Sequence, residues 1–407
     1  MINNQSHQFN NQHNQYSGAA IAIILAAIIP SISITPILPK MQAEFSYVPQ
    51  IDMLVQLSYA LPGLMAMLVA PFTGIISDRI GRGIIVITAS FLAAVLGTLP
   101  IILDSIWTII ASRAALGICQ GALIVCTSAL IADYFQNEQR ERVLGIKFGA
   151  VGVANILLFA VAGVISENNW TNVFMLYLWG AGATAIALLY LKHPPQHEEK
   201  ESRDMSFTIP WKQVMAPYVG ALLGAASFTL LFGHLPFLLE VRGISSSPAF
   251  AGIITSVAAT GMFISAFLYP KIIARMTAMN LWVLCFALVA LGCSILAISA
   301  NITGVIAGVA TIGLGCGATS PNSLNMLFEK VSPAGRGKVA GIQTMFFFFG
   351  IFGGPLIGVA LMRIFNSVDG IFFTWAGIAA VTSIAFLLAS KKSSVTNPSS
   401  IKQAKTL

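Results

Sequence analysis

The chain has 407 residues, of which 56% are hydrophobic and 9% are charged, with a mean hydropathy of +0.81. Soluble domains carry about 25% charged residues because their surface faces water, so this composition excludes a water-exposed globular enzyme. Intrinsic disorder is excluded too, because disordered chains have low hydrophobicity. The sequence therefore predicts a membrane protein whose chain crosses the bilayer many times.

The apolar runs are continuous and predict helices rather than a transmembrane β-barrel. No charge occurs between Gly18 and Pro39, or between Met276 and Phe328. Barrel strands instead show about ten residues of alternating apolar and polar character. A helix needs about 20 apolar residues to cross the bilayer, so the second run holds two spans that divide at Ser299–Asn301.

Twelve spans are predicted, in an all-α fold of two six-helix pseudo-symmetric bundles. The expected spans are 18–38, 52–73, 84–103, 106–132, 143–165, 172–191, 215–239, 249–270, 280–299, 302–328, 341–362 and 370–390. The expected domains are a disordered cytoplasmic tail at 1–17, a bundle at 18–191, a cytoplasmic linker at 192–214, a bundle at 215–390 and a cytoplasmic tail at 391–407.

Basic residues favour one orientation. With both termini in the cytoplasm, 18 of the 22 lysines and arginines fall in cytoplasmic segments, Lys147 among them. Lys40, Arg242 and Arg363 lie outside, and Arg113 falls within the fourth span. This bias follows the positive-inside rule, so the net charge of +7 indicates orientation and contact with anionic lipid rather than nucleic acid.

Chemical motifs for metal binding or catalysis are missing from the pattern. The five cysteines all fall within predicted spans and show no zinc-ligand spacing, so buried thiols without disulfides are expected. A membrane-embedded enzyme would need an intramembrane cluster of acids, histidines or nucleophiles, which the spans do not provide. No Gly-Lys-Ser/Thr phosphate loop occurs, and neither a cofactor nor ATP is expected.

The two halves share features at an offset of 196 residues. Gly117 and Gly121 correspond to Gly313 and Gly317, and Asp133 corresponds to Glu329. Arg140, Arg142 and Gly145 correspond in the same way to Arg336, Lys338 and Gly341. A parallel repeat of two six-helix halves places a substrate site between them and predicts transport by alternating access.

Two motifs resemble those of the major facilitator superfamily. The segment from Gly74 to Gly83, GIISDRIGRG, resembles the loop between spans two and three of that family, and RAALGICQG from Arg113 resembles its span-four motif. The pattern is most similar to the twelve-span branch of drug:proton antiporters and metabolite exporters. Span five keeps glycines where that branch usually also has a proline.

The resemblance implies that the loop, with Asp133 and Arg142 nearby, latches the outward-facing state. Gly74 is expected to permit close helix approach and Gly81 a tight turn. Asp78 is expected to accept hydrogen bonds from a helix N-terminus across the interface of the two halves, while Arg79 and Arg82 hold carboxylates or lipid phosphates. The predicted latch residues are Gly74, Asp78, Arg79, Gly81, Arg82, Asp133 and Arg142. The alternative is that Arg79 and Arg82 only anchor the loop at the membrane surface.

Polar residues inside spans are the candidates for coupling and substrate binding. Arg113 has no acid three or four residues away on its helix, so its partner is expected from elsewhere in the chain. The resemblance implies proton coupling or binding of an anionic substrate group at this residue. The other candidates are Gln120, Gln56, Asn155, His234, Asn322 and Gln343. Packing within the helix bundle is the alternative for each.

The proton carrier is the least defined part of the prediction. Span one holds no acid, and Asp52, Asp133 and Glu240 lie near helix ends, while His234 could titrate near neutral pH. The expected function is proton-coupled export of a drug-like or amphipathic metabolite by a monomer in a bacterial cytoplasmic (inner) membrane. Import of an organic acid or sugar by the same kind of transporter is the alternative, and these motifs do not separate the two.

Overall fold

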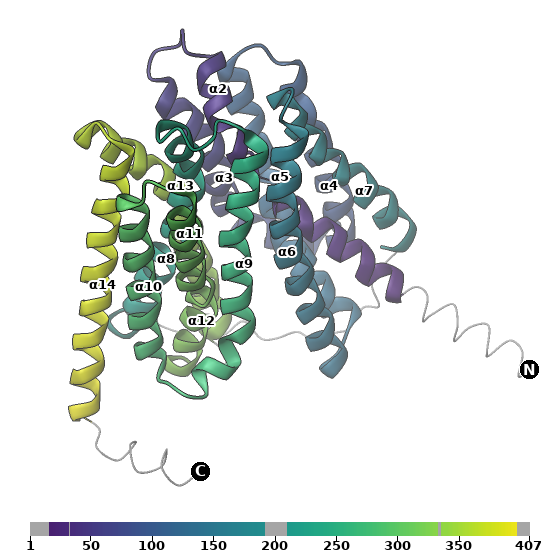
Figure 1. The fold of residues 1–407 in the computed structure, drawn as a ribbon. Coiled ribbons are helices and arrows are strands. Elements are labelled where there is room, and N and C mark those ends of the chain that lie inside the picture. The colour runs from purple at the N-terminus through teal and green to yellow at the C-terminus, as the bar shows by residue number, and fades with distance from the viewer. Residues whose placement is uncertain (1–15, 32, 192–209, 333–334, 397–407) are drawn as a thin grey trace, which may run out of the picture. The chain divides into compact units, whose positions relative to one another are not determined.

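The computed structural model describes residues 16–31, 33–191, 210–332 and 335–396 (Figure 1). All regular structure in these ranges is helical, and twelve helical segments are long and apolar enough to cross a membrane. The predicted number of spans is thus confirmed. Most of the predicted terminal tails (1–17 and 391–407) and of the linker (192–214) lies outside the described residues. The described parts of all three are largely helical, because several helices continue beyond their apolar cores.

The described residues divide into two compact units. The first contains residues 16–31, 33–191, 235–256 and 351–359, and the second contains 210–234, 257–332, 335–350 and 360–396. The division therefore does not follow the chain strictly, since two short segments from the second half pack with the first. The predicted bundles 18–191 and 215–390 remain a prediction.

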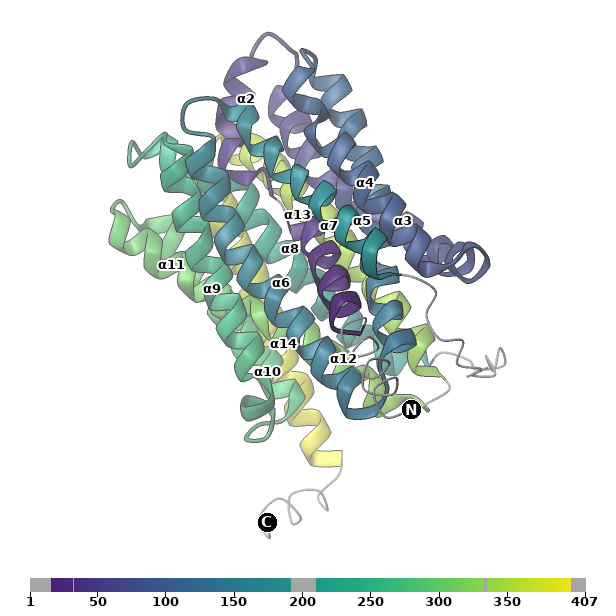
Figure 2. The ribbon, with the colours of Figure 1, turned by 90° about the vertical axis from the view of Figure 1, so that its right-hand side faces the viewer.

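Six candidate spans come from the first half of the chain. The first runs from Tyr16 to Glu44 and ends in the short helix α2, Leu38–Glu44. The helices that follow are α3 (Ile51–Ile80), α4 (Arg82–Thr98), α5 (Ile106–Tyr134), α6 (Asn137–Ile165), the 3-10 helix η4 (Trp170–Leu178) and α7 (Trp179–Tyr190). Helix α5 packs against both α3 and α4, and α4 also packs against η4 and α7 (Figure 2).

The second half supplies the other six spans. They contain α8 (Trp211–Val241), α9 (Pro248–Ile273), α10 (Ala278–Ile298), α11 (Ile302–Gly317) with α12 (Thr319–Lys330), α13 (Arg336–Phe365) and α14 (Val368–Thr396). Within the second unit α10 packs against both α11 and α14 (Figure 1). Trp282 stacks there on Phe286 and Phe386, with ring centroids 5.5 and 5.4 Å away.

The sequence repeat is also a repeat of packing. A Cβ atom at Gly117 would lie 2.6 Å from the backbone of Pro62, and one at Gly121 would lie 2.8 Å from Ala66. In the second unit, Gly313 meets Ala258 at 2.3 Å and Gly317 meets Met262 at 2.1 Å. Each residue is 196 positions after its counterpart in the first unit. Helices α3 and α5 therefore touch through glycines in the same register as α9 and α11.

Candidate functional site

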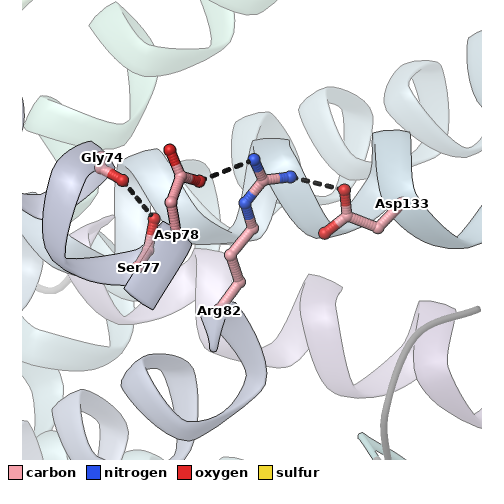
Figure 3. A network of polar contacts seen from close by, with 5 residues as sticks. All are labelled: Gly74, Ser77, Asp78, Arg82 and Asp133. Atoms are coloured by element: carbon pink, nitrogen blue, oxygen red, sulfur yellow. Dashed lines mark hydrogen bonds and ion pairs between the residues drawn. The ribbon is translucent and has the colours of Figure 1, made fainter. Parts of the chain in front are cut away.

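Two aspartates from different helices hold one arginine at an end of the first unit. Arg82, at the start of α4, donates from Nη2 to Asp78 Oδ1 of α3 at 3.1 Å. Its Nη1 is paired with Asp133 Oδ1 near the end of α5, so the guanidinium lies between the two carboxylates (Figure 3). We call Asp78, Arg82 and Asp133 the Arg82 cluster. Its side chains are partly exposed, from 24% at Asp133 to 48% at Asp78.

A tight turn at Gly81 positions Arg82 between Asp78 and Asp133. Helix α3 ends at Ile80 and α4 begins at Arg82, and Gly81 between them has a φ of 95°, which glycine adopts without strain. The tight turn expected at Gly81 is therefore present. The close helix approach expected at Gly74 is wrong for this conformation, because a Cβ there would meet no atom within 4 Å. Its carbonyl instead accepts a hydrogen bond from the hydroxyl of Ser77.

The other two predicted latch residues stand apart from this cluster. Arg79 and Arg142 are exposed, and neither is a partner in the ion pairs of the described residues. The structure thus brings together three of the predicted latch side chains and places these two bases outside the group. Their role in a latch remains a prediction.

Arg113 is buried, with 1% of its surface exposed, and its partners are aromatic rings rather than an acid. Its guanidinium carbon lies 4.9 Å from the ring centre of Phe174 and 5.0 Å from that of Tyr177, both in η4. It donates to the carbonyl of Gly97 at 3.0 Å and to the hydroxyl of Tyr177 at 3.2 Å. Rings and oxygens from α4 and η4 therefore hold this cation in place.

A second cation is buried in the first unit. Lys147 lies inside the predicted span 143–165, although it was counted with the cytoplasmic bases, and in the structure it lies ten residues after the start of α6, within the fifth candidate span. Only 5% of its surface is exposed, and its ammonium donates to Ser128 Oγ at 2.7 Å. Arg113 and Lys147 are the charged side chains that are buried among the described residues.

The remaining candidates are polar groups on separate helices. Gln56 (α3), Gln120 (α5) and Gln343 (α13) are buried, and Asn155 (α6) is half-buried. In the second unit, Asn322 of α12 is buried and donates to the carbonyl of Ala278 at 2.9 Å. Their part in substrate binding stays a prediction.

His234 is the buried imidazole of α8, with Nδ1 3.1 Å from the carbonyl of Leu230 one turn earlier. Its Nε2 is buried without a hydrogen-bond partner among the described residues. The acids Asp52 and Glu240 are half-buried and exposed, respectively, so neither is a carboxylate enclosed in a span. Within the described residues no three metal-ligating side chains gather into a possible site.

A carboxylate that the sequence analysis did not select joins α6 to α9 within the first unit. Glu167 Oε2 accepts hydrogen bonds from the hydroxyl of Ser247 at 2.8 Å and from the backbone N–H of Ala249 at 3.1 Å. Lys40 of α2 donates to the carbonyl of Glu167 at 2.7 Å. The Ala249 N–H, followed by the Ser247 hydroxyl, lowers the pKa of Glu167. Glu167 thus satisfies a free N–H in the first turn of α9, where the helix dipole favours negative charge.

A family model confirms the resemblance of the motifs. The model of the Major Facilitator Superfamily matches residues 19–350 and 246–407. The chain belongs to the major facilitator superfamily. It is therefore a multi-pass membrane transporter of small molecules, and its family and fold are those of transporters rather than enzymes.

Curated relatives of the chain are bacterial transport and resistance proteins. The quinolone resistance protein NorA of Staphylococcus aureus (strain MSSA476) is 23% identical over 317 residues, which cover 74% of this chain and 79% of NorA. The inner membrane transport protein YnfM of Escherichia coli (strain K12) is 23% identical over 242 residues, 57% of each protein.

Solved structures of transporters share the fold. A mutant of the nucleoside transporter NupG aligns with a TM-score of 0.76 at 15% identity, covering 92% of this chain and 99% of NupG. A bacterial homologue of the human lysosomal transporter Spinster, inward-facing and occupied, aligns with a TM-score of 0.72 at 16% identity, covering 92% and 96%. At these identities the likeness establishes the fold alone.

Proposed function

We propose that this chain is a secondary active transporter that works by alternating access and exports an amphipathic small molecule in exchange for protons. The observation that carries the proposal is the repeated glycine packing of α3–α5 and α9–α11. Parallel repeats are the architecture in which two halves rock around a central substrate site. Similarity to a quinolone resistance protein favours export of a drug-like molecule.

The moving bodies in this proposal are the predicted bundles 18–191 and 215–390. The Arg82 cluster fixes the turn between α3 and α4, and together with Arg79 and Arg142 it acts as the latch for the outward-facing state. The protein works as a monomer in a bacterial cytoplasmic membrane with both termini in the cytoplasm. Asp78, 48% exposed, is the member of the cluster with most surface left for a further partner.

Proton coupling has few candidate carriers. Among the described residues the spans enclose two buried cations and no buried carboxylate, and the imidazole of His234 has a free Nε2. His234 is therefore the proposed carrier, because its Nδ1 lies against the carbonyl of Leu230 and its Nε2 remains to accept a proton.

Import of a small organic solute, such as an organic acid or a sugar, is the second candidate function. The fold likeness to a nucleoside transporter favours it, since that protein and this chain share the architecture over 92% of this chain.

The test is transport in inverted membrane vesicles under an imposed pH gradient. Ethidium and the quinolone norfloxacin serve as probes, and the Asp78→Asn variant tests the latch. Export predicts accumulation inside inverted vesicles that stops when the gradient is collapsed, and Asp78→Asn removes it while membrane insertion is normal. Movement that ignores the gradient would refute proton coupling, and uptake only into right-side-out vesicles would favour import.

A further inference from the structure

We propose that Lys147 binds an anionic group of the transported molecule, so that the substrate class is amphipathic carboxylates. This inference rests on the proposed transport function and names a residue for substrate selection. It starts from the position of Lys147 within the fifth span, where ten helical residues precede it in α6, about 15 Å at 1.5 Å per residue.

The ammonium of Lys147 lacks a counter-ion among the described residues. Nζ of Lys147 donates to Ser128 Oγ at 2.7 Å and lies 5.5 Å from the ring centre of Phe148, and it takes no part in the ion pairs of Arg82. A lysine has three N–H donors, so this one hydrogen bond leaves two for another acceptor. A charged residue within a span is costly, and such residues mark substrate or ion pathways when they persist.

Arg113 also lacks an acidic partner, and its Nε has no hydrogen-bond partner among the described residues, but its surroundings differ from those of Lys147. Its guanidinium is enclosed by two aromatic rings and donates to the carbonyl of Gly97 and the hydroxyl of Tyr177. Lys147 instead bonds to a hydroxyl that lies on an exposed part of α5, and the bond between them is only partly buried. Of the two buried cations, Lys147 is therefore the one whose free donors lie beside exposed surface.

The repeat supplies an independent observation at this position. Residue 343, which lies 196 positions after Lys147, is the buried Gln343 of α13. The two units thus both carry a long hydrogen-bonding side chain at this register, on helices that are otherwise largely apolar. Packing alone favours apolar side chains at buried positions, so polar residues at both repeat-related positions favour a role in binding.

The chemistry of the site fits a carboxylate on an otherwise apolar molecule. An ammonium with two free donors forms charge-assisted hydrogen bonds with carboxylate oxygens, and the surrounding spans are apolar. A lipid phosphate offers the same chemistry, so the test must separate a solute from a lipid headgroup.

The experiment compares N-dansyl-phenylalanine with its methyl ester, which has the same fluorophore without the negative charge. Binding to the purified full-length protein is measured by fluorescence in nanodiscs of phosphatidylcholine. We expect wild type to bind the acid at least tenfold more tightly than the ester. Lys147→Gln should remove this preference with ester binding unchanged, and Lys147→Arg should keep most of it. Lys271→Gln, which alters an exposed lysine of α9, is the matched control and should bind as wild type does.

A second measurement needs no variant and so does not depend on whether Lys147→Gln folds. The acid, but not the ester, should protect Lys147 of wild type from an amine-reactive acylating reagent, as read by mass spectrometry. Equal binding of acid and ester, or equal protection by both, would overturn the proposal. Protection that appears only when phosphatidylglycerol is added would assign Lys147 to lipid and overturn it too. Because these readouts need no gradient, acid-selective binding without gradient-driven transport would refute the proposed function and leave the binding site standing.

Discussion

The contact of Glu167 with the start of α9 should hold together one end of the paired helices α6 and α9. The perturbation is Glu167→Ala, which removes the acceptor for both the Ser247 hydroxyl and the Ala249 N–H. A side-chain cap contributes about 1 kcal/mol, and a negative charge at a helix N-terminus about 0.3–1 kcal/mol. We therefore expect a loss of about 1–2 kcal/mol, which is roughly a tenfold shift between joined and separated helices.

The assay is a distance measurement between spin labels on the two helices. Val164 of α6 and Ile253 of α9 are exposed and accept labelled cysteines, while the five native cysteines are buried. Glu167→Ala should increase the population with a long distance between the labels. Glu44→Ala, which removes an exposed carboxylate of α2, is the control and should leave the distances unchanged. A double-mutant cycle with Ser247→Ala measures the coupling of the two side chains directly.

Acid should have the same effect as the substitution. The pKa of Glu167 is lowered by the contact, so its ionised form stabilises the joined helices at neutral pH, and this stabilisation is lost as pH falls through the lowered pKa. Glu167→Gln should therefore abolish the acid-induced separation of the labels. The reasoning is refuted if Glu167→Ala leaves the distances unchanged at neutral pH, or if wild type and Glu167→Gln respond to acid alike.

Three further tests of the packing use thermal unfolding of purified variants in detergent. Arg113→Lys keeps the charge but loses the planar contact with two rings, and it should destabilise the protein by about 1–3 kcal/mol; an unchanged midpoint would contradict the ring contacts. Gly317→Ala should lower the free energy of unfolding by about 1–3 kcal/mol, because its Cβ would lie 2.1 Å from a backbone oxygen. Gly377→Ala has open space around its Cβ and should raise the free energy of unfolding by about 0.5–1 kcal/mol. Equal effects of the two substitutions would refute the close packing at Gly317. Asp133→Asn should destabilise the protein by about 1 kcal/mol. Asp78→Asn should destabilise it less, because the Asp78 carboxylate is more exposed to water, and the reverse order would refute the stronger role of the Asp133 ion pair.

The number and type of the spans could be predicted because lipid leaves few choices. Continuous apolar runs of about 20 residues must form helices that satisfy their own hydrogen bonds. The ends of the helices were harder to predict from the sequence, because the apolar part of a span ends before the helix does. Helix α6 begins at Asn137 instead of the predicted residue 143, and α8 begins at Trp211 instead of residue 215.

Lys147 shows a second limit of the sequence. It lies inside the predicted span 143–165, yet it is counted with the cytoplasmic bases under the positive-inside rule because it lies near the end of the apolar run. The apolar and glycine neighbours on both sides, in Gly145-Ile-Lys-Phe-Gly149, were the signal that it continues the span. A count of charges by topology does not detect a side chain that lies deeper in the helix than its neighbours in the loop.

The sequence did not predict the partners of Arg113, for another reason. The expectation that a partner comes from elsewhere was correct, but an acid is the obvious partner for a cation. The rings of Phe174 and Tyr177 follow it by more than 60 residues, and aromatic residues are common in spans. Only the packing of α5 beside η4 identifies them.

The glycine contacts also limit how the two units can change shape. Where Gly117 and Gly121 meet α3, and where Gly313 and Gly317 meet α9, the nearest atoms belong mostly to the backbone of the facing helix. Sliding of packed helices needs room between them, and these contacts leave no room even for an added Cβ. The two glycine-packed pairs are therefore expected to keep their register when the units change shape.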